Sequence, residues 1–323
     1  MTAMAGSDRR QSVVAVVVTW NREDLLALTL AGLAAQSRPP EAVVVVDNAS
    51  TDGSGGVAGR HPVVTEVVTM PRNVGGAGGF AAGMARAIEG HAADLVWLMD
   101  DDTVPSPDAL RELLRARDAY PGEVRLVASR ADWHDGREHP MNTPRRRVGI
   151  SRAADGAAAH AAARPVRSAS FVSVLVDAAA VRRVGLPVAD YFLWNDDFEF
   201  TARLLRGGVG LYAPASRVRH LTKTFGDSEA DPGARFYNEV RNKLWVFTRS
   251  DALAPAERLL YGASTLARWS RTLGRSRERR ALVSHARRGA RDGLRPPRST
   301  TEVLADTPVA GDVARIEAGA GRG

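Results

Sequence analysis

The sequence predicts an α/β fold, in which an open, mostly parallel, twisted sheet is flanked by helices and followed by a basic helical extension at the C-terminus. Two observations lead to this prediction. Strand-like apolar runs alternate with amphipathic segments through residues 1–130, and such alternation is typical of parallel strands joined by helical crossovers. Beyond Pro255, the sequence instead contains helical segments rich in arginine.

The expected strands of the first half are short runs dominated by valine. Branching at Cβ restricts the side chain and favours extended backbone, so these runs fit strands better than helices. They lie at residues 13–19, 42–47, 63–69, 95–100 and 124–129.

The second half is expected to begin with a long irregular connection. Residues 131–167 contain much Gly, Ala and Pro and the cluster Arg145, Arg146 and Arg147, a composition typical of loops. Ordered structure then resumes with a strand at 170–177, a helix at 195–206, a strand pair at 210–220 and a helix at 234–248. The chain is therefore divided into a flexible N-terminus (1–11), a main domain (12–250), a basic helical extension (251–298) and a disordered tail (299–323).

Length and composition fit a globular protein of the cytoplasm. The 323 residues are 44% hydrophobic, which is enough to build a substantial core. There is no run of about 18 uncharged apolar residues, and the N-terminus lacks the apolar centre of a signal peptide. The absence of cysteine agrees with a cytoplasmic location and excludes disulfide and thiolate chemistry.

The formal charge of +7 comes almost entirely from arginine, because Lys223 and Lys243 are the only lysines. From Arg268 to Arg298, basic and apolar residues alternate. This pattern fits a solvated helix face, a helix lying on anionic lipid, or a nucleic-acid-binding surface. Composition alone leaves these three alternatives open.

Three consecutive carboxylates, Asp100, Asp101 and Asp102, come at the end of the apolar run at 95–100. Mutual repulsion makes ionised carboxylates costly there unless a cation or the hydrogen-bond donors of a substrate lie among them. In open α/β sheets, ligands bind beyond the carboxyl ends of the strands. The residues that follow the other expected strands are therefore candidates for the same site: Thr19 to Arg22, Asp47 with Asn48, and Asn73 with the glycines after it.

A glycine-rich segment, RNVGGAGGFAAGM at 72–84, follows the third expected strand and opens a helix. Gly76 to Ala81 satisfy the G-x-G-x-x-A pattern of dinucleotide-binding proteins, which makes a Rossmann dehydrogenase an alternative. That fingerprint normally lies on the first strand and uses one acid, whereas here two strand units precede it and three acids follow. A purely structural turn could also require these glycines. A P-loop is excluded, because neither lysine follows a glycine-rich loop of the required spacing.

A second acidic cluster lies in YFLWNDDFEF at 191–200. Asp196, Asp197 and Glu199 stand at the start of an expected helix, where capping alone would explain one or two acids. An apolar wall such as Trp194 disfavours the ionised form of a carboxylate and raises its pKa toward the value useful in a general base. The cluster therefore predicts a catalytic carboxylate, with capping as the alternative.

Two single residues are further candidates. His220 closes a strand-like segment, where a lone histidine is either structural or a metal ligand. Arg241 lies beside Asn242 in an expected amphipathic helix, and a buried arginine requires an anion.

Four segments together resemble the family 2 inverting glycosyltransferases of the GT-A fold. VVVTWNRED and VVVVDNASTDGS look like the two nucleotide-binding strands, DDD like the D-x-D-type metal motif, and WNDDFEF like the segment that carries the base. The match runs from about Val13 to about Phe247. RNVGGAGGF followed by WLMDDD is most similar to the galactofuranosyltransferases that build cell-wall galactan on a polyprenyl diphosphate carrier.

The resemblance implies transfer of galactofuranose from UDP-galactofuranose to a hydroxyl group of a lipid-linked saccharide acceptor. It implies that Asp102 and His220 ligate Mn²⁺ or Mg²⁺, and that Asp197 is the base that takes the proton from the acceptor hydroxyl. It assigns the nucleotide-sugar to Thr19, Arg22, Asp47, Asn73, Gly75, Gly76, Gly78, Gly79, Asp100 and Asp101. It assigns the acceptor to Trp194, Asp196, Glu199 and Arg241.

The sequence also departs from the family pattern. The Q-x-x-R-W segment of processive members is absent, so we expect one or a few additions rather than a long polymer. Given a lipid-linked acceptor, the region from Arg268 to Arg298 is expected to dock on the anionic inner face of the cell membrane, as a peripheral protein, and not on nucleic acid. A rhamnosyltransferase that uses dTDP-rhamnose is the close alternative. An NAD-dependent dehydrogenase and a catalytically silent binding module are alternatives from other classes.

Overall fold

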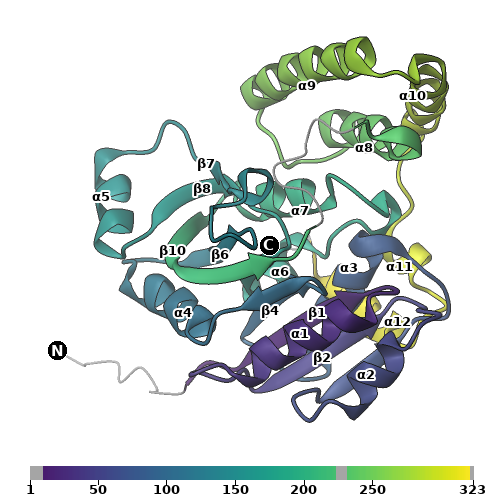
Figure 1. Cartoon of the computed structure of the whole chain (residues 1–323). Coiled ribbons are helices and arrows are strands. Elements are labelled where there is room, and N and C mark those ends of the chain that lie inside the picture. The colour runs from purple at the N-terminus through teal and green to yellow at the C-terminus, as the bar shows by residue number, and fades with distance from the viewer. Residues whose placement is uncertain (1–9, 223–230, 321–323) are drawn as a thin grey trace.

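The computed structural model describes residues 10–222 and 231–320. Its centre is a single mixed sheet, in which the described residues form ten strands (Figure 1). Nine of them follow the order β3-β2-β1-β4-β9-β6-β10-β8-β7, and β5 pairs with β10. This confirms the expected α/β class with an open sheet and flanking helices.

The nucleotide-binding half expected from the sequence consists of four parallel strands. They are β1 (Val13–Thr19), β2 (Ala42–Asp47), β3 (Glu66–Thr69) and β4 (Leu95–Asp100). β1 lies between β2 and β4, and its register pairs Thr19 with Asp47 and Val18 with Asp100. The polar residues that end these strands therefore lie at one edge of the sheet.

The other half is mixed in direction. It contains β5 (Thr103–Pro105), β6 (Val124–Asp132), β7 (Arg145–Arg146), β8 (Arg164–Ser168), β9 (Ser173–Asp177) and β10 (Val209–His220). β9 runs antiparallel to both β4 and β6 and joins the two halves. β5 pairs antiparallel with the end of β10, in a register that sets His220 opposite Thr103. This pairing carries His220 to the residues that follow β4, about 120 positions earlier in the chain.

Helices cover both faces of the sheet, and β1 contributes to the core on each side. Val14, Val16 and Val18 pack in the cluster that includes α3 (Gly75–Glu89), α6 (Ala178–Val184) and α7 (Asp196–Leu204). The odd-numbered residues of the same strand pack with α1 (Glu23–Ala34), α2 (Ser54–Arg60) and α4 (Ala109–Ala119). Burial on both faces explains why β1 is apolar throughout rather than alternating.

Two expectations about irregular segments are wrong. Residues 131–167 are not one long loop, because they contain the end of β6, β7, α5 (Arg152–His160) and the start of β8. Residues 299–320 are not a disordered tail, because they form α11 (Thr300–Val303) and α12 (Ala310–Gly319). Leu304 and Ile316 are buried in the core beside α3, whose small residues leave room for them. The expected strand pair at 210–220 is one long strand, β10.

The basic extension forms a helical subdomain at the top of Figure 1. It contains α9 (Pro255–Arg275) and α10 (Arg279–Gly293), and α10 packs on α8 (Phe236–Thr248). Gly289 and Gly293 allow close approach, since a Cβ on Gly289 would lie 2.5 Å from the carbonyl oxygen of Tyr237. Residues 1–9 of the expected flexible N-terminus (1–11) and Lys223 lie outside the described residues. Within the described ranges, no helix is long and apolar enough to cross a membrane.

Candidate active site

Three potential metal ligands meet at the edge of the sheet. Asp100 ends β4, Asp102 follows it, and His220 ends β10; one ligand atom from each lies within 4.8 Å of the others. The Nε2 atom of His220 is 3.1 Å from Oδ1 of Asp102. The sequence predicted Asp102 and His220 as ligands but assigned Asp100 to the sugar nucleotide, whereas the structure groups Asp100 with them.

The chemistry of this donor set fits a divalent cation. Oδ1 of Asp102 is buried and accepts no well-aligned hydrogen bond, while Oδ2 is held by the guanidinium of Arg22 at 2.5 Å. Nδ1 of His220 lies 2.9 Å from Oδ1 of Asn142, a contact that fixes the ring and leaves Nε2 for a ligand. Two carboxylates and one imidazole suit Mn²⁺, which accepts nitrogen more readily than Mg²⁺ does.

Charge repulsion within the cluster is large. Burial, together with the charges of Asp102 and Asp101, raises the pKa of Asp100 well above its usual range. Burial also acts to raise the pKa of Asp102, but the neighbouring His220 and the charge of Arg22 lower it overall. A bound cation would relieve the repulsion that the protein alone leaves at Asp100.

The side chain of Asp101 is hydrogen-bonded to residues at the end of β1. Its Oδ2 accepts hydrogen bonds from the Thr19 hydroxyl at 2.9 Å and from the Trp20 backbone N–H at 3.2 Å. Burial raises the pKa of Asp101 to about 6. The pair fastens the end of β1 to the end of β4, so both predicted nucleotide-binding residues have an internal partner.

The loops after β2 and β3 are tied together by asparagine side chains. Asn48 donates to the carbonyl of Gly75 and accepts from the N–H of Val74, both at 2.9 Å. Asn73 accepts from the N–H of Gly75 at 2.7 Å, and Oδ1 of Asp47 accepts from the N–H of Ser50 at 2.9 Å. The predicted donor-binding residues Asp47 and Asn73 are thereby held at the same edge as the acidic cluster.

Most of the glycines predicted to bind the donor have a packing role. Gly75 has a φ of +74°, and a Cβ there would lie 2.1 Å from the carbonyl oxygen of Phe192. A Cβ on Gly79 would lie 2.5 Å from Val18, and one on Gly78 would lie 2.6 Å from Val74. Among the four, only Gly76 faces open space in the described structure. The glycines let α3 approach β1 closely, which explains the dinucleotide-like pattern without a dinucleotide.

The second acidic cluster follows a strained loop. Phe192, Trp194 and Asn195 all have φ between 61° and 69°, a region that bulky residues rarely adopt. Nδ2 of Asn242 donates to the carbonyls of Tyr191, Leu193 and Trp194 at 2.7–3.0 Å. This clamp from α8 holds the loop that presents Asp196 and Asp197.

Asp196 and Asp197 lie in different environments. Asp196 is buried, and burial followed by the charge of Asp197 raises its pKa to about 8. Asp197 is half-buried and accepts from the N–H of Phe198 at 2.6 Å. Burial raises the pKa of Asp197 as well, but the nearby cations Lys243 and Arg145 oppose this rise. Of the two carboxylates, Asp197 is therefore the one whose ionised form is better stabilised.

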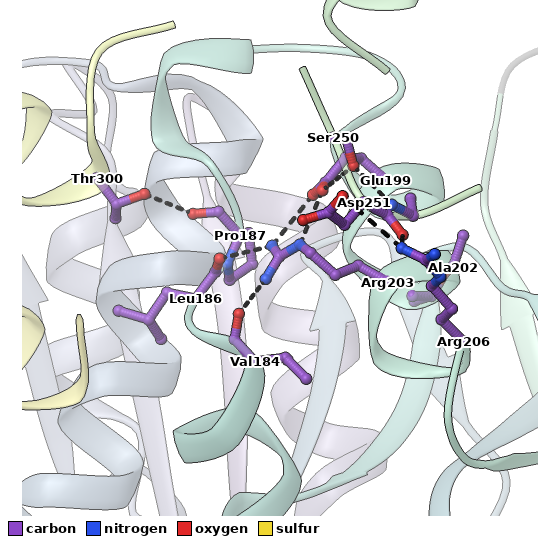
Figure 2. A network of polar contacts seen from close by, with 12 residues as sticks. Val184, Leu186, Pro187, Glu199, Ala202, Arg203, Arg206, Ser250, Asp251 and Thr300 are labelled. Carbon is purple, nitrogen blue, oxygen red and sulfur yellow. Dashed lines mark hydrogen bonds and ion pairs between the residues drawn. The ribbon is translucent and has the colours of Figure 1, made fainter. Parts of the chain in front are cut away.

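Glu199 is engaged inside the protein (Figure 2). It is 2% exposed and forms an ion pair with Arg203, whose Nε lies 2.8 Å from Oε1. Ser250 donates to the same oxygen at 2.7 Å. Glu199, predicted to bind the acceptor, instead links α7 to the segment after α8.

Arg241 and Trp194, also predicted to bind the acceptor, belong to the clamped loop. The guanidinium of Arg241 donates to the carbonyls of Asp190 and Tyr191 and lies 4.4 Å over the Trp245 ring. Trp194 is only partly buried and immediately precedes the segment that holds the two aspartates. Arg241 therefore supports the loop from behind.

Comparison with known proteins agrees with this geometry. Residues 10–242 match the family described as "Glycosyltransferase like family 2". The chain belongs to this family. It is similar to galactofuranosyltransferase GlfT1 of Mycobacterium tuberculosis, with 36% identity over 262 residues, covering 74% of this chain and 83% of that protein. The GlfT1 of Mycolicibacterium smegmatis is 32% identical over 201 residues, covering 61% of this chain and 66% of that protein.

Solved structures support the GT-A fold of this glycosyltransferase. A fragment of S. aureus TarS superposes with a TM-score of 0.59 at 17% identity, over 95% of this chain and 88% of that chain. GalNAc-T7 with UDP, GalNAc and Mn²⁺ gives a TM-score of 0.55 at 15% identity, over 93% of this chain and 57% of that chain. Membership of the family sets aside the dehydrogenase alternative.

Sequence reasoning missed several residues of this glycosyltransferase site. They are Asn142, Arg145 and Lys243. Asn142 and Arg145 lie in the segment taken for an irregular loop, where the arginine cluster was interpreted only as loop composition. Lys243 carried a usable signal, because it is one of only two lysines and directly follows Arg241 and Asn242, which the sequence analysis had singled out.

Proposed function

We propose that this glycosyltransferase moves galactofuranose, with inversion, from UDP-galactofuranose to a hydroxyl group of a polyprenyl-diphosphate-linked saccharide in cell-wall galactan synthesis. The observation that supports this best is the cluster Asp100–Asp102–His220 at the carboxyl edge of the sheet, together with a separate pair, Asp196 and Asp197. Ionisation of Asp196 would raise the pKa of Asp100, so the two carboxylates lie within electrostatic range of each other. The identity of the sugar is supported by the GlfT1 relatives.

In this proposal the donor lies across the ends of β1, β2 and β4. Asp47 and Asn73 are positioned for the nucleotide, and Asp100, Asp102 and His220 would hold Mn²⁺ or Mg²⁺. When bound, the cation would act as a Lewis acid on the leaving diphosphate. Arg22 adds a positive charge beside Asp102 and can stabilise the negative charge that develops on the phosphate oxygens of the leaving group.

Asp197 is proposed as the base. Inversion requires one carboxylate that removes a proton from the acceptor hydroxyl as it attacks the anomeric carbon from the face opposite the leaving group. Because burial raises the pKa of Asp196 to about 8 while nearby cations oppose the rise at Asp197, Asp197 is the member of the pair better suited to accept a proton. Trp194 then provides an apolar wall for the acceptor sugar.

The experiment is a donor panel. The purified protein is incubated with UDP-galactofuranose, other UDP-sugars and dTDP-rhamnose, with Mn²⁺, with and without a short lipid-linked saccharide. Release of UDP that requires both UDP-galactofuranose and acceptor supports the proposal. Release of dTDP from dTDP-rhamnose would establish the rhamnosyltransferase alternative, and no release from any donor would leave only a binding module.

The helical subdomain is proposed to dock on the anionic inner face of the membrane, where the lipid-linked acceptor lies. Leu259, Leu260 and Leu266 of α9 are 79%, 70% and 62% exposed, and arginines line the same helix. Exposed leucines beside basic side chains suit an interfacial helix. Co-sedimentation with vesicles of anionic lipid at low salt tests this; equal binding to neutral vesicles would argue against the electrostatic part.

A further inference from the structure

One pocket, whose lining includes none of the three potential metal ligands, is lined mainly by basic groups among its charged side chains. It has a volume of about 230 Å³ and lies between the β3–α3 connection, the 3-10 helix Ala189–Tyr191, α8 and the segment before α11. Its polar lining consists of Arg72, Asn73, Asp190, Asn238, Arg241 and Arg298. Asn73 and Arg241, which the sequence analysis assigned to donor and acceptor, thus meet in one cavity.

The charges of this pocket are not balanced. Arg298 forms a two-pronged contact with Asp190, at 2.8 and 3.1 Å, and Asp190 is the sole acid among the lining residues. Arg72 reaches Asp306 at 2.9 Å, but both side chains are about half exposed, so that pair is weak and easily exchanged. The lining therefore contains three guanidinium groups and one carboxylate.

Arg241 has no carboxylate partner among the described residues. Its Nε and Nη2 donate to Asn242 and to two backbone carbonyls, and its plane lies over the Trp245 ring. These contacts fix the guanidinium without neutralising it. A held arginine with an uncompensated charge is a preorganised anion site.

We propose that this pocket binds a phosphate or diphosphate group. The volume is below the range of about 300–1,000 Å³ typical of whole-ligand pockets, so it suits a small anion or the charged part of a larger molecule. Arg72, Arg241 and Arg298 would supply charged donors, and the amides of Asn73 and Asn238 would supply neutral ones. The anion enters beside Arg72 and Arg298, the two exposed members.

Two sources of a diphosphate are consistent with the proposed function, on which this identification rests. One is the polyprenyl diphosphate of the acceptor, because Arg298 follows α10 of the subdomain proposed to lie on the membrane. The other is the diphosphate of the nucleotide, because Asn73, which lines the pocket, is also a predicted donor-binding residue. Both present the same chemistry to the pocket, and the experiment separates them.

The test is calorimetric titration of the intact protein with inorganic pyrophosphate, with EDTA present so that the acidic cluster holds no metal. Arg72→Gln is expected to weaken binding about 3- to 10-fold, because it removes one charged donor at a half-exposed position. Asp190→Asn is expected to strengthen binding about 3-fold or more, because it removes the negative charge of the lining. Arg115→Gln, an exposed arginine of α4, is the matched control and should change nothing.

The opposite signs make the test decisive. The inference is overturned if the wild-type protein does not bind pyrophosphate, or if Arg72→Gln and Asp190→Asn both bind it as the wild type does. Binding is compared only for variants whose melting temperature equals that of the wild type. A result from one such variant, at Arg72 or at Asp190, is enough to decide. An equal effect of Arg115→Gln would show that only net charge matters and would also overturn it.

Competition then separates the sources. If pyrophosphate still binds with UDP and Mn²⁺ at saturation and geranyl diphosphate displaces it, the pocket serves the acceptor. If UDP displaces it and geranyl diphosphate does not, the pocket serves the nucleotide. If the donor panel shows no sugar transfer but the Arg72 and Asp190 variants change pyrophosphate binding as expected, the anion site is supported and the proposed function fails. If sugar transfer occurs but the variants bind pyrophosphate as the wild type does, the proposed function is supported and the anion site fails.

Discussion

Replacing Arg203 by methionine should destabilise the protein strongly, because Arg203 is the cation that compensates the buried charge of Glu199 (Figure 2). The side chains of Glu199 and Arg203 are 2% and 16% exposed. Arg203 also donates to the carbonyls of Val184 and Leu186, so it joins α7 to the end of α6. Methionine keeps much of the length of the side chain but none of these hydrogen bonds.

The magnitude follows from the burial of the pair. Removing one member of a buried ion pair typically costs about 3–5 kcal/mol, since it leaves an uncompensated charge. Glu199→Gln alone should cost less, about 1–3 kcal/mol, because Arg203 keeps its carbonyl partners and is nearer to solvent. In the double variant, Glu199→Gln removes the stranded charge, so it should recover roughly 2 kcal/mol of the loss caused by Arg203→Met.

Urea unfolding at pH 7 measures the free energy of unfolding of the wild type, both single variants and the double variant. The acceptor KM of Glu199→Gln is measured in parallel. The reasoning is refuted if Arg203→Met loses less than about 1 kcal/mol, or if Glu199→Gln gives no recovery in its background. A raised acceptor KM for Glu199→Gln without loss of stability would return Glu199 to the acceptor site.

Four further predictions concern the site and the helical subdomain. Asp197→Asn should lower turnover by roughly 10²- to 10⁴-fold, measured as UDP release, while the dissociation constant of UDP stays unchanged. His220→Gln should weaken Mn²⁺ binding by at least about 10-fold, measured by titration of the metal alone. Burial lowers the pKa of Lys243 to about 8, so between about pH 8 and 10.5 the unfolded lysine holds a proton that the folded one has lost, and stability rises with pH. Lys243→Met should therefore gain about 3 kcal/mol of unfolding free energy at pH 7 and progressively less above pH 8. Leu259→Ser with Leu266→Ser should weaken binding to anionic vesicles about 10-fold or more.

Each of these predictions has a matched control. Asp196→Asn mimics the protonated carboxyl and should retain more turnover than Asp197→Asn at pH 7; the reverse order would move the base to Asp196. His160→Gln on α5 should leave Mn²⁺ binding intact. For Lys243, an equal gain at pH 7 and pH 10.5 would contradict the titration argument. Leu28→Ser, at a half-exposed position of α1, should not affect vesicle binding.

The edge of the sheet could be predicted from the sequence because its determinants are local. Valine runs specify parallel strands, parallel strands end at one edge, and the polar residues at those ends must then meet. The segments at 131–167 and 299–320 could not be predicted in the same way. In 299–320, Leu304 and Ile316 become core only because α3 offers a surface of small residues, and in 131–167 the buried alanines, such as Ala158, belong to the core on the other face; neither contact is encoded within its own segment.

The roles of individual site residues depended on partners that the sequence does not pair. Asp101 and Glu199 have the same composition cues as Asp102 and Asp197, yet each is turned inward by a partner, Thr19 or Arg203. The spacing of Glu199 and Arg203 by four residues in a helix was a usable signal for an internal ion pair. An acidic motif therefore indicates where chemistry takes place, while the nearest cation or donor decides which acid performs it.

The loop before α7 connects this selection to backbone strain. Positive φ values at bulky residues cost of order 1–3 kcal/mol each and persist only where surrounding contacts impose them. Here the contacts are three hydrogen bonds from Asn242 and two from Arg241 to the carbonyls of the loop. Without this clamp, we expect the loop to relax and α7 to begin in another direction. Asp196 would then leave its present buried position, and Asp197 would no longer lie near the charge of Lys243. Arg241 and Asn242 are therefore expected to influence the proposed reaction indirectly, by holding the loop that gives Asp196 and Asp197 their different environments.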